Sequence, residues 1–173
     1  MRDYQLLRQR GFIPVINEDD ARSTEELPDP GEKAFSDNDG LASLIARYMN
    51  NGKKNVLLVL LTDVYGVYSK ESFKRGIREV IDVVKDAAGL ESQALEEKTA
   101  DEIVRRGGIA SKINAASAAS AEGVYAVIAS GQYWKFDDAY QQRVAGAERG
   151  YKPVHAILEG RAVGTRFVPQ NDK

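Results

Sequence analysis

The sequence contains no cysteine and only one histidine among its 173 residues. Without cysteine the chain can form neither disulfide bonds nor thiolate metal sites, and it has no thiol nucleophile. The histidine, His155, lies in an apolar stretch with no obvious carboxylate or hydroxyl partner nearby in the sequence, so we expect it to be structural. The absence of cysteine also fits a reducing, cytoplasmic environment.

Long apolar runs and an excess of one charge are absent as well. The longest apolar run, Val56 to Leu61, is far too short to cross a bilayer, and Met1 to Arg10 lacks the apolar core of a secretory signal. The 24 Lys and Arg nearly balance the 26 Asp and Glu, giving a net charge of -2, which is not typical of a nucleic-acid binder. We therefore expect a cytoplasmic protein that binds neither membranes nor nucleic acid.

The residues that are present suit one globular domain, since 43% of them are hydrophobic. Segments of strand length alternate with segments of helical spacing. The strands are expected at Phe12 to Ile16, Val56 to Leu61 and Val124 to Ala129, and the helices at about Asp37 to Met49 and Ile109 to Glu122. This alternation predicts an α/β layered fold with a mainly parallel sheet.

Other segments are shorter or less clear. Short helices are expected before Gly11 and from Thr99 to Gly107. The spacing of Ile77 to Val84 fits a helix or a strand, and both remain open. Val154 to Leu158 and Arg166 to Val168 are expected to be short final elements.

Three polar segments follow predicted strands: Asn17 to Asp20, Thr62-Asp63 and Ser130-Gly131. Ligands of parallel sheets bind beyond the carboxyl ends of the strands, where helix N-termini also converge. Asn17 to Asp20 and the helix start Asp37 to Asp39 are both rich in Asn and Asp. Each acid taken singly is more often solvent-exposed or a helix cap, but together the two clusters could hold an amino group and a carboxylate.

A further candidate site combines Gly107-Gly108 with Lys112 on the first turn of the next helix. Glycines let the backbone approach a ligand closely, helix amides favour an anion, and a lysine can follow charge on a transferring phosphoryl group. The segment is not a Walker P-loop. Taken alone, two turn glycines and a surface lysine are the simpler interpretation.

Five segments together resemble the glutamate 5-kinases, a family of amino-acid kinases, and occur in that family's order. They are IPVINEDD (Ile13 to Asp20), FSDNDGLASLIA (Phe35 to Ala46), LLTDVYGVY (Leu60 to Tyr68), GGIASKINAA (Gly107 to Ala116) and VGTRFVP (Val163 to Pro169). The resemblance implies a three-layer α/β sandwich with the carbamate kinase-like fold. It also implies ATP-dependent, magnesium-assisted phosphorylation of the L-glutamate side-chain carboxylate, the first step of proline biosynthesis.

The resemblance also implies roles for individual residues. Asn17, Asp20 and Asn38 match positions that hold the amino-acid substrate, and Asp39 matches the acid that organises the catalytic lysines. Lys112 matches the lysine that stabilises the phosphoryl group in flight. The implied ATP contacts are Thr62, Asp63, Arg106, Gly107, Gly108, Ile109, Ala110, Ser111 and Lys112. No residue is implied as a metal ligand.

The chain departs from the family pattern at its beginning. Family members begin with a strand, a lysine and a Gly/Ser-rich turn that binds phosphates, and nothing similar precedes Phe12. Smaller departures are Asp19, Ser36, Tyr65 and Arg106, together with the lack of a C-terminal RNA-binding-like domain. We therefore expect one N-terminally truncated domain over residues 1–173, with a substrate part at 12–50 and a nucleotide part at 55–169.

Three functional hypotheses remain open at this point. The chain is a glutamate 5-kinase whose N-terminal part is separate or lost, or it is an inactive fragment that binds nucleotide or amino acid or partners a complete kinase. A third possibility keeps the fold and changes the substrate to another amino acid, carbamate or a nucleotide. A truncated sheet would expose strand edges, which predicts a homo-oligomer or association with the missing N-terminal half.

Overall fold

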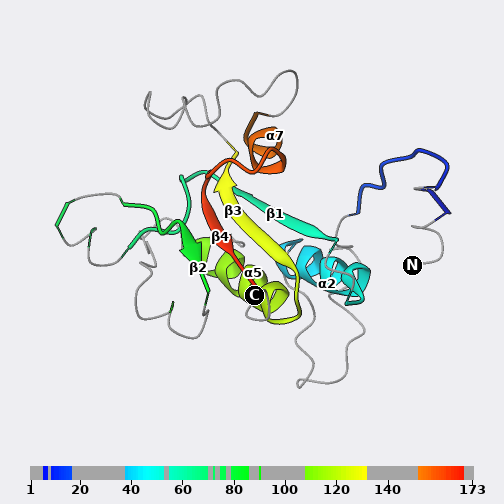
Figure 1. The fold of residues 1–173 in the computed structure, drawn as a ribbon, viewed down its shortest axis with the longest axis horizontal. Helices are drawn as coiled ribbons and strands as arrows, with labels where there is room; N and C mark the ends of the chain where they lie inside the picture. The colour runs from blue at the N-terminus through cyan, green and yellow to red at the C-terminus, as the bar shows by residue number, and fades with distance from the viewer. Residues whose placement is uncertain are drawn as a thin grey trace, which may run out of the picture.

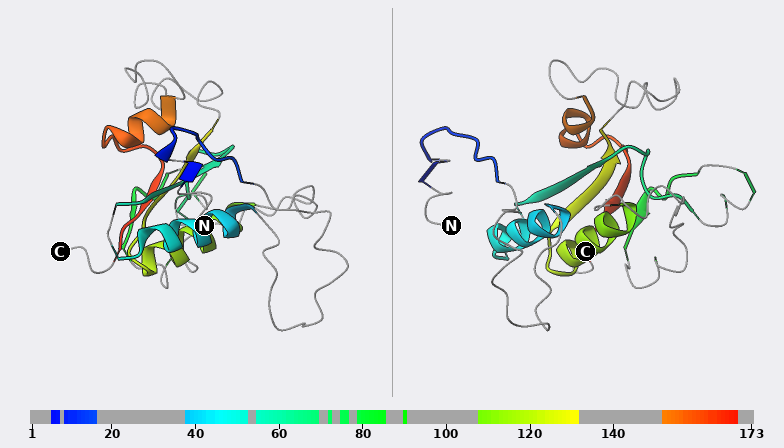
Figure 2. Two further views of the ribbon diagram at one scale, coloured as in Figure 1. Left: turned by 90° about the vertical axis from the view of Figure 1, so that its right-hand side faces the viewer. Right: turned by 180° about the vertical axis from the view of Figure 1, so that it is seen from behind.

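A four-stranded sheet lies between two layers of helix (Figures 1 and 2). The computed structural model describes residues 6–7, 9–16, 38–52, 55–69, 72, 75–76, 79–85, 90, 108–131 and 152–169. Helices α2 (Asn38–Asn50) and α5 (Ile109–Ala121) cover one face of the sheet, and α7 (Lys152–Leu158) covers the other. The predicted three-layer α/β architecture is confirmed.

The sheet has the strand order β1-β3-β4-β2. Its strands are β1 (Leu57–Thr62), β2 (Val83–Val84), β3 (Tyr125–Ser130) and β4 (Thr165–Phe167). β1 pairs with β3 in parallel, β2 pairs with β4 in parallel, and β3 pairs with β4 antiparallel. The expected mainly parallel sheet is therefore present, with one antiparallel pairing at its centre.

The continuous aliphatic sequence of β1 suits a strand that is covered on both faces. Leu58 and Leu60 pack into the core beneath α2 and α5, while Val59 packs against the smaller core beneath α7. The alanines of α5 let that helix approach the sheet closely, and Ala116 and Ala119 are fully buried. Both helix layers are thus held by apolar contacts with the same strands.

The segment Phe12 to Ile16 is not the buried strand that its apolar sequence predicts. It has no strand assignment, and Ile13 and Val15 are 90% and 93% exposed. Figure 1 shows this segment apart from the sheet. The prediction fails because strand propensity reflects packing and pairing with neighbours, and no ladder among the described residues includes this segment. The short helix before it is confirmed at Leu6, Leu7 and Gln9, and Gly11 follows with φ +80°.

The ambiguous segment Ile77 to Val84 is extended where the structure describes it. Val80 forms an isolated bridge with Tyr68, and Val83–Val84 is strand β2. The expected helix from Thr99 to Gly107 lies outside the described residues. The final elements are confirmed as α7 and β4.

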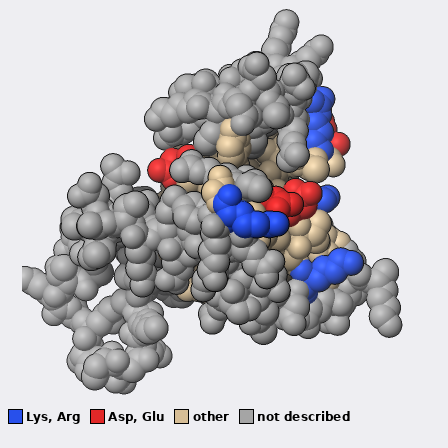
Figure 3. Space-filling view, turned by 90° about the vertical axis from the view of Figure 1, so that its left-hand side faces the viewer, with Lys and Arg blue, Asp and Glu red and all other residues tan. Residues whose placement is uncertain are grey.

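The surface of the described residues carries charges of both signs. In the view of Figure 3, Lys and Arg side chains lie beside Asp and Glu side chains instead of forming one large patch of a single sign among the described residues. This agrees with the near balance of charges in the sequence. Within the described part of the chain, no helix has the length and apolar character needed to span a membrane.

Candidate active site

The carboxyl ends of β1 and β3 lie next to each other. Thr62 is paired with Ser130, and the amide of Gly131 donates to the carbonyl oxygen of Thr62 at 2.7 Å, which extends the ladder beyond the strands. Two of the three predicted polar strand ends are therefore brought together. The third, Asn17 to Asp20, lies outside the described residues.

The N-termini of α2 and α5 point to this same edge of the sheet. α5 turns through Gly123, which has φ +84°, directly into β3, so that the helix runs antiparallel to the strand and begins near the carboxyl end of β3. α2 precedes β1 in the same way, with a turn at Asn51 and Gly52. The two helices are consequently parallel, and their positive dipole ends lie beside the strand ends.

An ion pair joins the first turns of the two helices. Lys112 Nζ donates to Asp39 Oδ2 at 2.8 Å and to Asp39 Oδ1 at 3.0 Å. The side chains of Lys112 and Asp39 are only 13% and 14% exposed, respectively. Two residues that the sequence analysis assigned to catalysis, which are far apart along the chain, are thus in direct contact.

Helix stability alone does not explain the place of Lys112. An acid in the first turn, such as Asp39 in α2, interacts favourably with the helix dipole, whereas a lysine in the first turn of α5 interacts unfavourably with it. Contact with Asp39 offsets that cost. The pair therefore keeps a cation at a helix N-terminus, where positive charge is already concentrated and where an anion would be attracted.

The start of α5 has no side-chain cap from the described residues. Gly108 occupies the N-cap position in an extended conformation and has no side chain that could cap the helix. The first turn contains no acid. A Cβ atom added at Gly108 would meet nothing within 4 Å. Within the described part of the chain, this glycine thus leaves space beside the start of α5.

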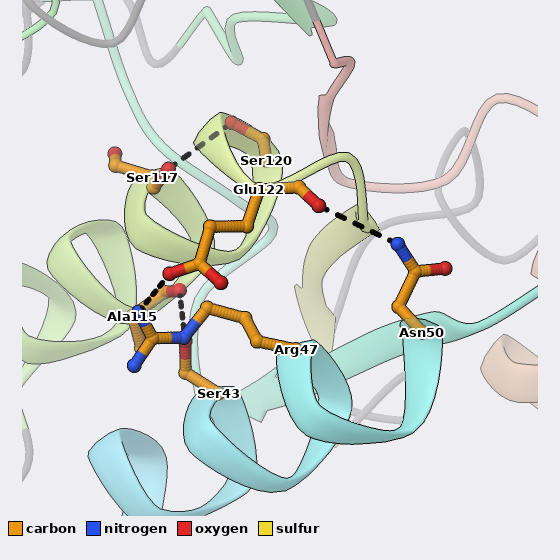
Figure 4. A network of polar contacts seen from close by, with 7 residues as sticks. All are labelled: Ser43, Arg47, Asn50, Ala115, Ser117, Ser120 and Glu122. Atoms are coloured by element: carbon orange, nitrogen blue, oxygen red, sulfur yellow. Dashed lines mark hydrogen bonds and ion pairs between the residues drawn. The ribbon is translucent and has the colours of Figure 1, made fainter. Parts of the chain in front are cut away.

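Polar contacts farther along the helices fix their register (Figure 4). The buried hydroxyl of Ser43 donates to the carbonyl oxygen of Ala115 at 2.8 Å. Arg47 pairs with Glu122, and the buried Asn50 amide reaches the carbonyl oxygens of Glu122 and Gly123 at 3.4 and 3.3 Å. Together with the ion pair of Asp39, these contacts form a row that we call the α2–α5 seam. The seam holds Asp39 opposite Lys112.

Thr62 and Asp63 form the end of β1 and the start of the next turn. The Thr62 hydroxyl donates to Asp63 Oδ1 at 3.3 Å. Bends continue through Gly66 before Val67 returns to the core. These two side chains thus lie at the edge of the sheet toward which the helices point.

The predicted site residues fall into two groups. Asn38, Asp39, Thr62, Asp63, Gly108, Ile109, Ala110, Ser111 and Lys112 lie on the strand ends and helix starts just described. Asn17, Asp20, Arg106 and Gly107 lie outside the described residues. Sequence reasoning missed Ser43 and Asn50, although polar residues four and eleven positions after Asp39, on the helical face that carries Asp39, were a usable signal. It gave no role to Thr165.

Among the described residues, no group of three or more His, Cys, Asp or Glu side chains could hold a metal ion. Mg²⁺ in phosphoryl-transfer sites is commonly held by one or two carboxylates together with the phosphates of the substrate. A single carboxylate such as Asp63 suits that mode, whereas both oxygens of Asp39 already accept hydrogen bonds from Lys112.

Comparison with known proteins agrees with this arrangement. Residues 3–130 match the family model described as the amino acid kinase family. Curated relatives include proteins called glutamate 5-kinase from Synechococcus sp. (strain JA-2-3B'a(2-13)), 33% identical over 97% of the chain, and from Myxococcus xanthus (strain DK1622), 35% identical over 98%. A glutamate 5-kinase of Clostridium acetobutylicum is 29% identical over 97%.

The chain spans only part of each of these relatives, namely 38%, 37% and 52% of their respective lengths. The match nonetheless covers nearly the whole chain and bears out the resemblance noted from its motifs. The family model alone covers well over half of the residues and includes α2, β1, α5 and β3. The chain therefore belongs to the amino acid kinase family.

Proposed function

We propose that the chain acts in ATP-dependent phosphorylation of the side-chain carboxylate of L-glutamate, which gives γ-glutamyl phosphate for proline biosynthesis. The observation that carries the proposal is the Asp39–Lys112 pair at the point where two helix N-termini and two strand ends converge. The named relatives support the choice of reaction. In our proposal residues 1–173 are one partial kinase domain, with the substrate part at 12–50 and the nucleotide part at 55–169.

Lys112 would stabilise the phosphoryl group during transfer. In this reaction a carboxylate oxygen of glutamate attacks the γ-phosphorus of ATP, and the bond from that phosphorus to the oxygen of ADP breaks. The attacking group is already deprotonated at neutral pH, so no general base is needed. What the protein must supply is position and positive charge. An ammonium group oriented by Asp39 supplies both.

The nucleotide would lie against the uncapped start of α5. Glycine at Gly108 leaves room for a phosphate, and the amides of Ile109, Ala110 and Ser111 belong to the first turn. Thr62 and Asp63 would contact the nucleotide from the end of β1, and Arg106 and Gly107 from the preceding segment. Mg²⁺ would neutralise phosphate charge, with at most one or two carboxylates of the described residues as ligands.

Glutamate would bind beside the start of α2. Asn38 is the first residue of that helix and adjoins Asp39, so a substrate held there is next to the ion pair. We assign Asn17 and Asp20 to the same task on the basis of the family resemblance. The lack of cysteine supports a cytoplasmic location for this reaction.

An alternative is that the chain binds nucleotide or amino acid without transferring phosphate, or partners a complete kinase. The exposed apolar side chains of Phe12 to Ile16 favour it, as do Leu57 and Leu61, which are part-exposed on β1, the end strand of the described sheet. Such surfaces promote association with a second copy or with a chain that carries the N-terminal half of these kinases.

The test is formation of γ-glutamyl hydroxamate from ATP, glutamate and hydroxylamine by the purified 173-residue chain, with ATP binding measured separately by calorimetry. The proposal expects hydroxamate that depends on ATP, glutamate and Mg²⁺ and is lost in Lys112→Met. ATP binding without hydroxamate would support the alternative. A folded chain that does neither would contradict the proposal and the nucleotide-binding form of the alternative.

A further inference from the structure

The turn at Asp63 to Gly66 is attached to the core at its far end through a threonine hydroxyl. The amide of Val67 donates to Thr165 Oγ1 at 2.8 Å, and both residues are fully buried. The carbonyl oxygen of Val67 accepts from the amide of Ile81 at 2.8 Å. The Thr165 hydroxyl on β4 therefore satisfies the buried amide of Val67, a residue that lies outside the strands.

Thr165 is itself held in place by the centre of the sheet. It pairs with Ile128 of β3, and Ile128 pairs with Leu60 of β1, two residues before Thr62. Its hydroxyl thus projects from a rigid part of the core toward the turn that follows β1. The link therefore connects the start of β4 with the residue that follows the Asp63–Gly66 turn.

Two glycines make this close approach possible. A Cβ atom at Gly66 would lie 2.8 Å from Thr165 Oγ1 and 2.9 Å from Val80 Cγ1. Gly164 has φ +70°, and a Cβ atom there would lie 2.1 Å from the carbonyl oxygen of Ile128. A side chain at Gly66 would push segment 66–67 away from Thr165, and a side chain at Gly164 would push the start of β4 away from Ile128 and Ala129 of β3. The backbone at both positions is therefore adapted to the contact that Thr165 makes.

We propose that Thr165 is a positioning residue, whose hydroxyl fixes the Asp63–Gly66 turn in the conformation that binds nucleotide. This inference rests on the proposed function, because it concerns the side of the site assigned to ATP. Thr165 acts through the Val67 amide and not on the reacting atoms. It also lies beyond residues 3–130, the part matched by the family model.

The Val67 amide is buried, and a buried amide without a hydrogen-bond partner costs free energy. Without the hydroxyl, the Val67 amide must either stay unsatisfied or move toward water, and the second choice requires the turn to shift. A shifted turn changes the position of Asp63, which is four residues away. Loss of the hydroxyl should therefore weaken ATP binding more than it slows the chemical step once ATP is bound.

The experiment compares Thr165→Val, which removes only the hydroxyl from a β-branched side chain, with Thr165→Ser, which retains it. Ser120→Ala is the matched control, because it deletes a hydroxyl that bonds within α5 to the carbonyl oxygen of Ser117. Hydrogen exchange of residues 63–67 is measured without ligand on the full 173-residue chain, followed by ATP affinity and the separate KM and kcat values.

We expect Thr165→Val to speed exchange in the turn and to raise the ATP dissociation constant about tenfold, equivalent to about 1.4 kcal/mol. The KM for ATP should rise while kcat changes little. Thr165→Ser should restore both properties, and Ser120→Ala should leave both unchanged.

Unchanged exchange in the Thr165→Val turn would overturn the inference, as would a serine variant as impaired as the valine variant. Faster exchange with unaltered ATP affinity would also overturn the inference, because Thr165 would then have a purely structural role. A wild-type chain that does not bind ATP would contradict the proposed function instead, and exchange alone would then decide whether Thr165 fixes the turn.

Discussion

The two ends of the α2–α5 seam are held by different chemistry. At the C-terminal end, Arg47 and Glu122 pair where their side chains are 25% and 56% exposed, and the buried Asn50 amide reaches the carbonyl groups of Glu122 and Gly123, just after α5. At the N-terminal end, Asp39 and Lys112 pair in a largely buried position. Both ends join the same two helices.

The contacts at the C-terminal end stabilise the packing of the two helices. The stability of the fold does not require the ion pair at the N-terminal end. A basic residue in the last turn of α2 follows the ordinary rules of helix termination. The Asn50 amide satisfies carbonyl groups in the turn that leads from α5 to β3. A lysine in the first turn of α5 breaks those rules and requires a buried acid beside it. We infer that the C-terminal end of the seam serves the fold and that the N-terminal end serves the site.

The largest effect is expected for Lys112→Met. Loss of the cation should lower hydroxamate formation by about a thousandfold, since phosphoryl transfer depends on charge stabilisation. The variant leaves the carboxylate of Asp39 without its partner, so the free energy of unfolding should fall too. The double variant Lys112→Met/Asp39→Leu should regain stability without regaining activity. Recovery of activity in the double variant would show that Lys112 acts only through the fold.

Asn50→Ala tests the opposite end of the seam. It removes a buried donor to two carbonyl oxygens, so the free energy of unfolding should fall by about 1–3 kcal/mol in denaturant titration. The ATP dissociation constant of the folded chain should not change. A variant that keeps its stability but loses ATP affinity would mean that the two ends of the seam are not separate in function.

The smallest effect is expected for Glu122→Gln, which neutralises the exposed partner of Arg47. Exposed ion pairs contribute little, so the free energy of unfolding should change by less than about 1 kcal/mol. That difference should vanish at about 1 M salt, where exposed charges are screened. A large loss that persists in high salt would show that the Arg47–Glu122 contact holds this end of the seam more strongly than an exposed ion pair can.

The long elements of the fold could be predicted because local pattern and final environment agree. The helix expected at Asp37 to Met49 is α2, and the aliphatic run Val56 to Leu61 is β1, shifted by one residue. Helix α5 and strand β3 also lie within a residue or two of their predicted bounds. Phe12 to Ile16 failed because an apolar run says nothing about whether a neighbouring strand is there to pair with it.

Only part of the site could be predicted from the sequence. The turn glycines and Lys112 were visible as a motif, and the family resemblance connected Lys112 to Asp39. The seam contacts of Ser43 and Asn50, and the hydroxyl contact of Thr165, join residues far apart along the chain. Periodicity within one element carries no information about such contacts, because they arise from the packing of one element against another.

The strand order also has a consequence for how the chain folds during synthesis. β4 lies between β3 and β2, so β2 has no partner among the described strands until residues 165–167 have left the ribosome. Local elements such as α2 and α5 can form early, but the centre of the sheet must wait for long-range pairing, which is slow. Val83 and Val84 would meanwhile present an unpaired edge, and a nascent chain released before β4 would be exposed to aggregation.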